Sequence, residues 1–210
     1  MYEEILTKET REVLELLKKL NVLKNFYLAG GTGLSFHLKH RISDDLDFFS
    51  QKEINTEEII QKIKKRGKFK LIREEWGTVI GTLNNVRISF FTYQYPLLKQ
   101  LKNFKNVNVA DIIDIALMKI SSISSRGNKR DFIDLYFICK EVISLEELLN
   151  LFDKKYREIE YNKSHIIKSL VYFEDAEREP MPDMLVKVNW DEIKIYFENE
   201  IKNFSFLKNI

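Results

Sequence analysis

The chain has 210 residues, of which 44% are hydrophobic, enough for a buried core in one larger or two small domains. Its net charge of +2, from 34 Lys and Arg against 32 Asp and Glu, argues against a cationic coat for non-specific DNA binding. One cysteine, Cys139, builds neither an internal disulfide nor a zinc cluster. The charged N-terminus does not resemble a signal peptide, and no apolar run reaches the roughly 18 residues that a membrane helix needs. These features predict a soluble, cytoplasmic protein with no membrane partner.

The first hundred residues predict alternating helices and strands. Apolar residues at helical spacing predict a helix within 3–20, and FYLA at 26–29 predicts a short strand that leads through glycines into a helix. DLDFF at 45–49 predicts a strand, and NTEEIIQKIKKRG at 55–67 predicts a capped helix. Segments 68–75, 77–83 and 86–93 predict three further strands, the last two joined in a tight hairpin at Asn84-Asn85.

After Pro96 the pattern becomes helical. Apolar residues at helical spacing predict helices in the segments 109–126, 128–142, 144–156, 162–173 and 190–204. We therefore predict an α+β protein, with a mixed sheet and its helices over 1–100 and a mostly helical domain over 101–210.

One motif in the first domain carries chemistry. Gly30, Gly31 and Thr32 open a predicted helix, whose free N–H groups and threonine hydroxyl would form an anion site suited to a polyphosphate. Asp45 and Asp47 lie on one face of the next strand, where two carboxylates repel unless a cation lies between them. Mg²⁺ (or Mn²⁺) is the natural candidate. Together these features predict metal-assisted phosphoryl or nucleotidyl transfer; taken singly, they also fit a simple turn and a solvated strand end.

The segment YLAGGTGLSFHLKHRISDDLDFF resembles the first motif of the AbiEii/AbiGii toxin family, which belongs to the DNA polymerase beta-like nucleotidyltransferase superfamily. The shared pattern is Gly-Gly-Thr, twelve residues and Asp-Leu-Asp. A later block, DIALMKISSISSRGNKRDFIDLYFI, resembles the Lys helix and the Arg-Asp-x-x-Asp-Leu segment of that family. The resemblance implies a polymerase beta-like core and transfer of NMP from an NTP to an acceptor hydroxyl.

The resemblance also implies roles for single residues of the first motif. Gly30, Gly31 and Thr32 would bind the nucleotide phosphates, while Asp45 and Asp47 would hold the metal and act in catalysis. Arg41 would pair with those acids or bind the nucleotide.

The second block leaves functional and structural interpretations open. Lys119 lies in an apolar helical run and needs a partner; the resemblance points it at the nucleotide phosphates, and the alternative is a lysine that reaches water. Asp131 would be catalytic, by orienting Lys119 or contacting the acceptor, although an acid in a first helical turn is stabilised there in any case. Asp134 could pair with Arg130 or Lys119. Arg126 and Arg130 could contact a triphosphate or RNA.

The chain departs from many superfamily members in one respect. The strand predicted at 86–93 has no third carboxylate, and Ser89 or Thr92 would stand in its place. This favours one magnesium ion over two.

By resemblance the acceptor is the 3′ end of tRNA, and the protein is a toxin with a cognate antitoxin. The alternatives left open are a small-molecule acceptor such as an aminoglycoside, a protein side chain, or a non-catalytic nucleotide-binding module.

Overall fold

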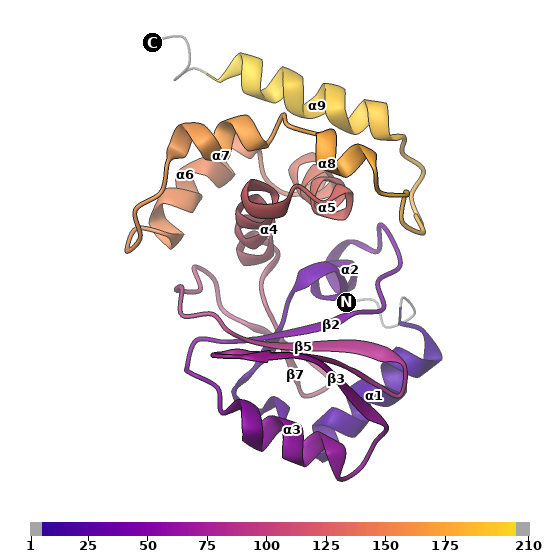
Figure 1. The fold of residues 1–210 in the computed structure, drawn as a ribbon. Helices are drawn as coiled ribbons and strands as arrows, with labels where there is room; N and C mark the ends of the chain where they lie inside the picture. The colour runs from indigo at the N-terminus through magenta and orange to yellow at the C-terminus, as the bar shows by residue number, and fades with distance from the viewer. Residues whose placement is uncertain (1–5, 205–210) are drawn as a thin grey trace. The chain divides into compact units, whose positions relative to one another are not determined.

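A computed structural model describes residues 6–204 of the chain. It divides into two compact units, unit 1 (Met1–Asp111) and unit 2 (Ile112–Ile210). Figure 1 shows each of them as a ribbon.

Unit 1 combines one mixed sheet with helices. Its helices are α1 (Lys8–Lys19), the short 3-10 helix η2 (Leu23–Asn25), α2 (Gly30–Leu38) and α3 (Thr56–Lys64). Its strands are β1 (Tyr27–Leu28), β2 (Leu46–Ser50), β3 (Phe69–Glu75), β4 (Thr78–Leu83), β5 (Val86–Thr92), β6 (Lys102–Phe104) and β7 (Val107–Val109).

The seven strands form a sheet in the order β3-β4-β5-β2-β1-β7-β6. The pairs β2–β5 and β1–β7 are parallel, and the other neighbours are antiparallel. In unit 1, α1 and α3 cover one face of this sheet and α2 lies on the other (Figure 1). The strand that carries Asp47 and directly follows Asp45, β2, is therefore central and pairs on both sides.

Side chains along β2 alternate between the hydrophobic core and the face that carries the candidate site. Leu46 and Phe48 are fully buried and belong to the hydrophobic core that also includes Leu14 and Leu17 of α1 and Ile63 of α3. Because successive side chains of a strand point to opposite faces, Asp47 points toward the α2 face. The apolar residues of this strand thus fix the direction of its acid.

The tight hairpin predicted at Asn84-Asn85 is confirmed. Both residues have positive φ, 49° and 69°, as a two-residue turn of the type favoured between antiparallel strands requires. A second hairpin, β6–β7, turns at Lys105 and Asn106 in the same way, with φ of 47° and 66°. The sequence pattern does not predict this second hairpin, because its strands are only three residues long.

Unit 2 consists of helices. They are α4 (Ile112–Arg126), α5 (Lys129–Glu141), α6 (Leu145–Lys155), α7 (Lys163–Ser169), α8 (Glu174–Glu177) and α9 (Trp190–Asn203). Helix α4 packs against α5, α6 and α7, and α5 also packs against α8 and α9. The ring of Phe132 contacts the rings of Phe173, Trp190 and Phe197 in its core. Within residues 6–204, no helix is long and apolar enough to span a lipid bilayer.

Candidate functional site

The start of α2 has backbone donors without a side-chain cap. Its N-cap residue is Ala29, which offers no capping oxygen, whereas Thr7, Asn55, Ser144, Asn162 and Asn189 cap α1, α3, α6, α7 and α9. The first intrahelical bond runs from Gly33 N to Ala29 O. The N–H groups of the first three helical residues therefore have no partner within the helix and carry partial positive charge. This is the backbone geometry that favours a bound anion.

Gly30 brings this helix start against the carboxylate of Asp47. Its φ is +62°, in the left-handed region, and a Cβ built at this position would lie 2.6 Å from Asp47 Oδ2. Only glycine fits such a contact without displacing the acid. The backbone agrees, because Ala29 N donates to Asp47 O over 3.0 Å. The structure thus brings the glycine motif together with the second acid of the Asp-Leu-Asp motif.

Gly31 is packed equally closely, against a cation. A Cβ at this position would lie 2.3 Å from a terminal nitrogen of Arg41 and 2.8 Å from the hydroxyl of Ser43. Arg41 is almost fully buried, and its guanidinium donates to Ile42 O over 3.0 Å. The positive end of α2 and the Arg41 guanidinium therefore lie together, which favours negative charge at this point.

The Thr32 hydroxyl is engaged with the loop before β2. It donates toward the backbone carbonyls of Ser43 and Asp45 and lies 3.0 Å from the Ser43 hydroxyl. Thr32 is fully buried. The Thr32 side chain therefore fixes the loop that ends at Asp45. Its backbone N–H, and not its hydroxyl, is the group that could bind an anion at the start of α2.

The two acids provide a donor set that suits magnesium. Asp45 immediately precedes β2 and Asp47 lies within it, and both are partly exposed. Among residues 6–204, no three His, Cys, Asp or Glu side chains gather as a ready-made metal-binding group. Mg²⁺ is commonly bound by one or two carboxylates, with waters and substrate phosphates completing its shell. Two acids beside an uncapped helix start fit that pattern.

The position across from Asp47 is occupied by Ser89. In the parallel pairing of β2 with β5, Asp47 is the partner of Ser89 and Ser50 is the partner of Thr92. Ser89 therefore points to the same face as Asp47, whereas Thr92 points to the opposite one. Of the two residues offered for the place of a third acid, the one on the face of Asp47 is thus the buried Ser89.

Lys119 and Asp131 meet in unit 2, inside a buried cluster of charges. The Lys119 ammonium lies 2.6 Å from Asp131 Oδ1 and 2.6 Å from Asp134 Oδ2. Arg126 contacts the other oxygen of Asp131, with Nε at 3.1 Å and a terminal nitrogen at 3.0 Å. The three inner side chains are at most 7% exposed, while that of Arg126 is 59% exposed. Of the roles left open for these residues, an Asp131 that orients Lys119 matches this geometry.

Two features of the Asp47 face could not be located from the sequence alone. Arg87 lies one residue before Ile88, the partner of Leu46, so it stands across from Asp45. An aromatic row also follows the acids, with the partners Phe49 and Phe91 stacked at 5.1 Å and Tyr93 against Phe49 at 5.6 Å. Strand periodicity gives the face of each residue within its own strand, but only the pairing register brings them beside the acids.

A glycine-led helix facing an Asp-Leu-Asp strand on a mixed sheet defines a nucleotidyltransferase fold of the polymerase beta-like type, here followed by helices. The sequence profile of the family described as nucleotidyl transferase AbiEii toxin, type IV toxin–antitoxin system, matches residues 14–96 and 92–206. The chain therefore belongs to the AbiEii nucleotidyltransferase toxin family, and it is an enzyme of the nucleotidyltransferase class.

Other comparisons agree with this assignment. An uncharacterized protein of Aquifex aeolicus is 40% identical over 204 residues, which cover 95% of this chain and 97% of that protein. The nucleotidyltransferase toxin MenT4 of Mycobacterium tuberculosis shares the fold at a TM-score of 0.55 and 13% identity, over 97% of this chain and 86% of that one. The antibiotic-resistance factor ANT(2″)-Ia shares it at a TM-score of 0.53 and 10% identity, over 71% and 95%. At such low identity the two structures show the fold alone.

Proposed function

We propose that the protein transfers NMP from an NTP, with magnesium or manganese bound, to the hydroxyl at the 3′ end of tRNA. It would act in the cytoplasm as the toxin of a toxin–antitoxin system, with a cognate antitoxin as partner. The class of enzyme and the toxin family are those of the matching profile. The metal, the acceptor, the compartment and the partner are the parts that this proposal adds.

One observation carries the proposal. The carboxylate of Asp47 faces Gly30 at a distance that leaves no room for a side chain, at the point where α2 offers uncapped N–H groups. A phosphate bound at those N–H groups would be repelled by the adjacent Asp47 carboxylate unless a cation lies between the two. A metal-bound triphosphate supplies both the cation and the anion, which is why this pairing supports nucleotide chemistry better than a structural role.

In unit 1, we assign phosphate binding to the start of α2 and metal binding to the two acids. The N–H groups of Gly30, Gly31 and Thr32 would bind the β- and γ-phosphates, with Arg41 adding positive charge behind them. Asp45 and Asp47 would hold the divalent ion, which supplies charge neutralisation on the triphosphate. The acceptor hydroxyl would then attack the α-phosphorus in line and release pyrophosphate, and the fixed donors would stabilise the charge that develops.

In unit 2 we assign Asp131 and Asp134 to the positioning of Lys119. The two carboxylates fix its ammonium from two sides, and Lys119 would neutralise phosphate charge in the transition state. This role predicts that Lys119→Met lowers kcat by about 10²-fold or more. Asp134→Asn, which removes only one carboxylate charge from the cluster, should lower kcat less while leaving KM for the NTP nearly unchanged.

The central experiment uses transfer of label. The purified protein is incubated with each α-labelled NTP, Mg²⁺ and total RNA, and the products are separated by size. We expect label in the tRNA band, and its loss by at least about 10²-fold in Asp45→Asn and in Asp47→Asn. Label on a small molecule or on protein would contradict the tRNA acceptor, and absence of transfer despite NTP binding would contradict the enzymatic proposal.

Asp44 provides a matched control. It is exposed, it precedes Asp45 directly, and its backbone carbonyl accepts from the Thr10 hydroxyl. Asp44→Asn removes the same charge from the same loop, so it should retain transfer. The same three variants can be compared for growth arrest on expression, which Asp45→Asn and Asp47→Asn should relieve and Asp44→Asn should not. Arrest that persists when both site acids are replaced would refute the catalytic toxin.

A further inference from the structure

Cations gather on the acid-bearing face of the unit 1 sheet, at the end where Asp45 enters it. Lys70 of β3 is the partner of Thr82 of β4, and Thr82 is the partner of Arg87 of β5. Partners on neighbouring strands point to the same face, so Lys70 and Arg87 flank Thr82 on one side of the sheet. Arg87 in turn stands across from Asp45, one residue before the Leu46–Ile88 pair.

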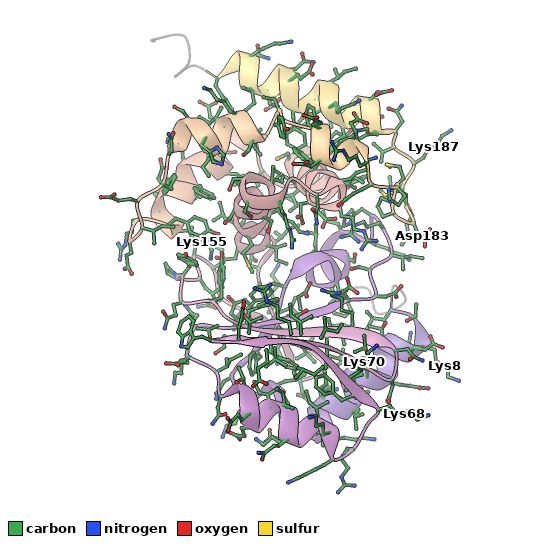
Figure 2. The ribbon with its side chains drawn as sticks, in the orientation of Figure 1. Lys8, Lys68, Lys70, Lys155, Asp183 and Lys187 are labelled. Carbon is green, nitrogen blue, oxygen red and sulfur yellow. The ribbon has the colours of Figure 1, made fainter. Side chains whose placement is uncertain are left out.

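Lys68 extends this set along β3. It lies two residues before Lys70 and one before the start of β3, and its carbonyl oxygen accepts from the N–H of Asn84 in the β4–β5 turn, which continues the pairing of β3 with β4. Lys68 and Lys70 lie on the same side of unit 1 in Figure 2, where Lys8 of α1 also projects. Lys68, Lys70 and Arg87 are all exposed. We call these three residues the cationic strip.

The charges of β3 are sorted by position along the strand. Its acids, Glu74 and Glu75, lie at the far end, where Glu75 is neutralised by Arg73 at 2.6 Å. The end beside Asp45 carries the lysines. Strands are spaced about 4.8 Å apart, so Arg87 and Lys70 are about 10 Å from each other and Arg87 is one strand away from Asp45. The cations of β3 and β5 other than Arg73 therefore lie at the end of the sheet where Asp45 enters, with Arg87 next to Asp45 and Lys70 two strands further out.

We propose that the cationic strip binds backbone phosphates of the RNA acceptor and so holds its 3′ end beside Asp45. This inference rests on the proposed function, since it supplies the acceptor of that same site with a binding surface. The strip suits a polyanion better than a protein partner because it consists of exposed lysine and arginine side chains that flank Thr82. Protein interfaces, in contrast, depend on buried apolar and aromatic anchors. A net charge of +2 does not oppose this, because the positive charge is local.

The test measures RNA binding without catalysis. A fluorescein-labelled 12-nucleotide single-stranded RNA is titrated with the full chain, in the absence of NTP and Mg²⁺, at several KCl concentrations. In the triple variant Lys68→Gln, Lys70→Gln, Arg87→Gln we expect Kd to rise about tenfold or more. The slope of log K against log[KCl] should become shallower by about 2, since each phosphate contact in a single strand contributes about 0.7.

The matched control removes three charges from the other face of the same unit. Lys64, Lys65 and Arg66 are exposed and lie at the end of α3. Their replacement by Gln should leave Kd and the salt slope at wild-type values, and both triple variants should melt at the wild-type temperature. Equal Kd and equal slope for the two triple variants would overturn the cationic strip.

Two further readouts separate this inference from its rivals. If the strip variant keeps RNA affinity but loses retention on immobilised poly-glutamate, the surface serves an acidic protein and the proposal is wrong. If the wild-type protein transfers NMP to no RNA, the proposed function fails. The binding titration still decides the strip in that case, because it requires no transfer.

Discussion

Gly30 is the residue on which the geometry of the candidate site most depends. Its positive φ and its contact with Asp47 both exclude a side chain. We predict that Gly30→Ala lowers the free energy of unfolding by more than the roughly 1–2 kcal/mol that a left-handed alanine costs. It should also abolish NMP transfer, because the new methyl group displaces the Asp47 carboxylate. Urea unfolding and the transfer assay measure the two effects.

Gly127 separates these two causes. It also has positive φ, +57°, but a Cβ there would approach nothing closer than 3.7 Å. Gly127→Ala should therefore show the backbone cost alone. If the two variants lose the same stability and Gly30→Ala retains transfer, the contact with Asp47 has no consequence and the site as described is wrong.

We predict that His37 makes the free energy of unfolding depend on pH. Its Nε2 lies 2.9 Å from Ala110 O, and burial lowers the pKa of this imidazole below 6.5, opposed by the hydrogen bond to Ala110. Lys102 lowers this pKa further, and Asp111 acts in the opposite direction. Below pH 6.5 the unfolded chain thus takes up a proton that the folded chain resists. The contribution of neutral His37 to the free energy of unfolding should be fully present above pH 6.5. It should be lost as the pH falls from 6.5 through the lower pKa of the folded state.

The prediction is checked by urea unfolding at pH 7.5, 6.5 and 5.5. His37→Gln should flatten the loss of stability between the last two values. His165→Gln is the control, because His165 is exposed although its Nε2 also lies near a carbonyl, 3.1 Å from Ser124 O. A profile that His37→Gln leaves unchanged would show that other groups cause the dependence.

At the residue scale, sequence identifies acids more readily than it identifies their partners. Asp45 and Asp47 stand out because charge in an apolar strand needs a reason. The bonds of Thr32 to the Ser43 and Asp45 carbonyls do not stand out, because they depend on a loop that returns to the helix. From the sequence, Asp134 can pair with either Lys119 or Arg130. The contact with Lys119 becomes evident only in the three-dimensional structure.

Among the helices of unit 2, α4 and α6 are joined by a buried ion pair. Lys155 Nζ lies 2.7 Å from Asp114 Oδ1, and both side chains have 0% exposure. Burial lowers the pKa of Lys155, and the bond to Asp114 opposes that shift. We predict that Asp114→Leu or Lys155→Met alone costs about 3–5 kcal/mol of unfolding free energy, because each leaves one buried charge without its main partner.

The double variant tests the physical reason for this cost. Asp114→Leu with Lys155→Met removes both charges and fills the space with apolar groups, which is often neutral in energy. We expect it to recover most of the stability that each single variant loses, as a double-mutant cycle in urea would measure. Additive losses would show that the two residues act separately.

Elements with strong local signals are the ones that sequence predicts. The Asn84-Asn85 pair between two apolar strands predicts the β4–β5 hairpin. The spacing of apolar residues predicts the helices of unit 2. The β6–β7 hairpin has the same turn geometry at Lys105 and Asn106, but its strands offer only a few apolar residues. It is stabilised by pairing with β1, where Leu28 meets Val109, and such a contact is invisible in local sequence.

On the scale of the whole molecule, that hairpin decides where the units divide. The sequence pattern places a change from sheet to helices near residue 100, whereas the structure divides the chain after Asp111. The difference is the β6–β7 segment, which adds two strands to the sheet beyond β1. The residues of the nucleotide site proposed in unit 1 all precede either boundary, so the proposed site does not depend on where the domain ends.

A ligand that binds only the folded state stabilises the molecule, and this gives a test that requires no acceptor. At a hundredfold excess over Kd, Mg·NTP should add about 2.7 kcal/mol to the unfolding free energy of the transition that includes unit 1. For a chain of this size that corresponds to a rise of about 5–10 °C in the melting temperature. Excess EDTA should remove most of the rise, because the phosphates and the two acids then repel each other.

Variants of the acids show whether the stabilisation by Mg·NTP arises at the proposed site. Asp45→Asn with Asp47→Asn should melt near the wild-type temperature without ligand and show little additional rise with Mg·NTP, whereas Asp44→Asn should show the full rise. Differential scanning calorimetry with and without Mg²⁺, at one NTP concentration, gives all the values needed. If the Asp45, Asp47 double variant shifts as far as the wild type does, the nucleotide binds elsewhere. If EDTA leaves the wild-type shift intact, the two acids do not act through a metal.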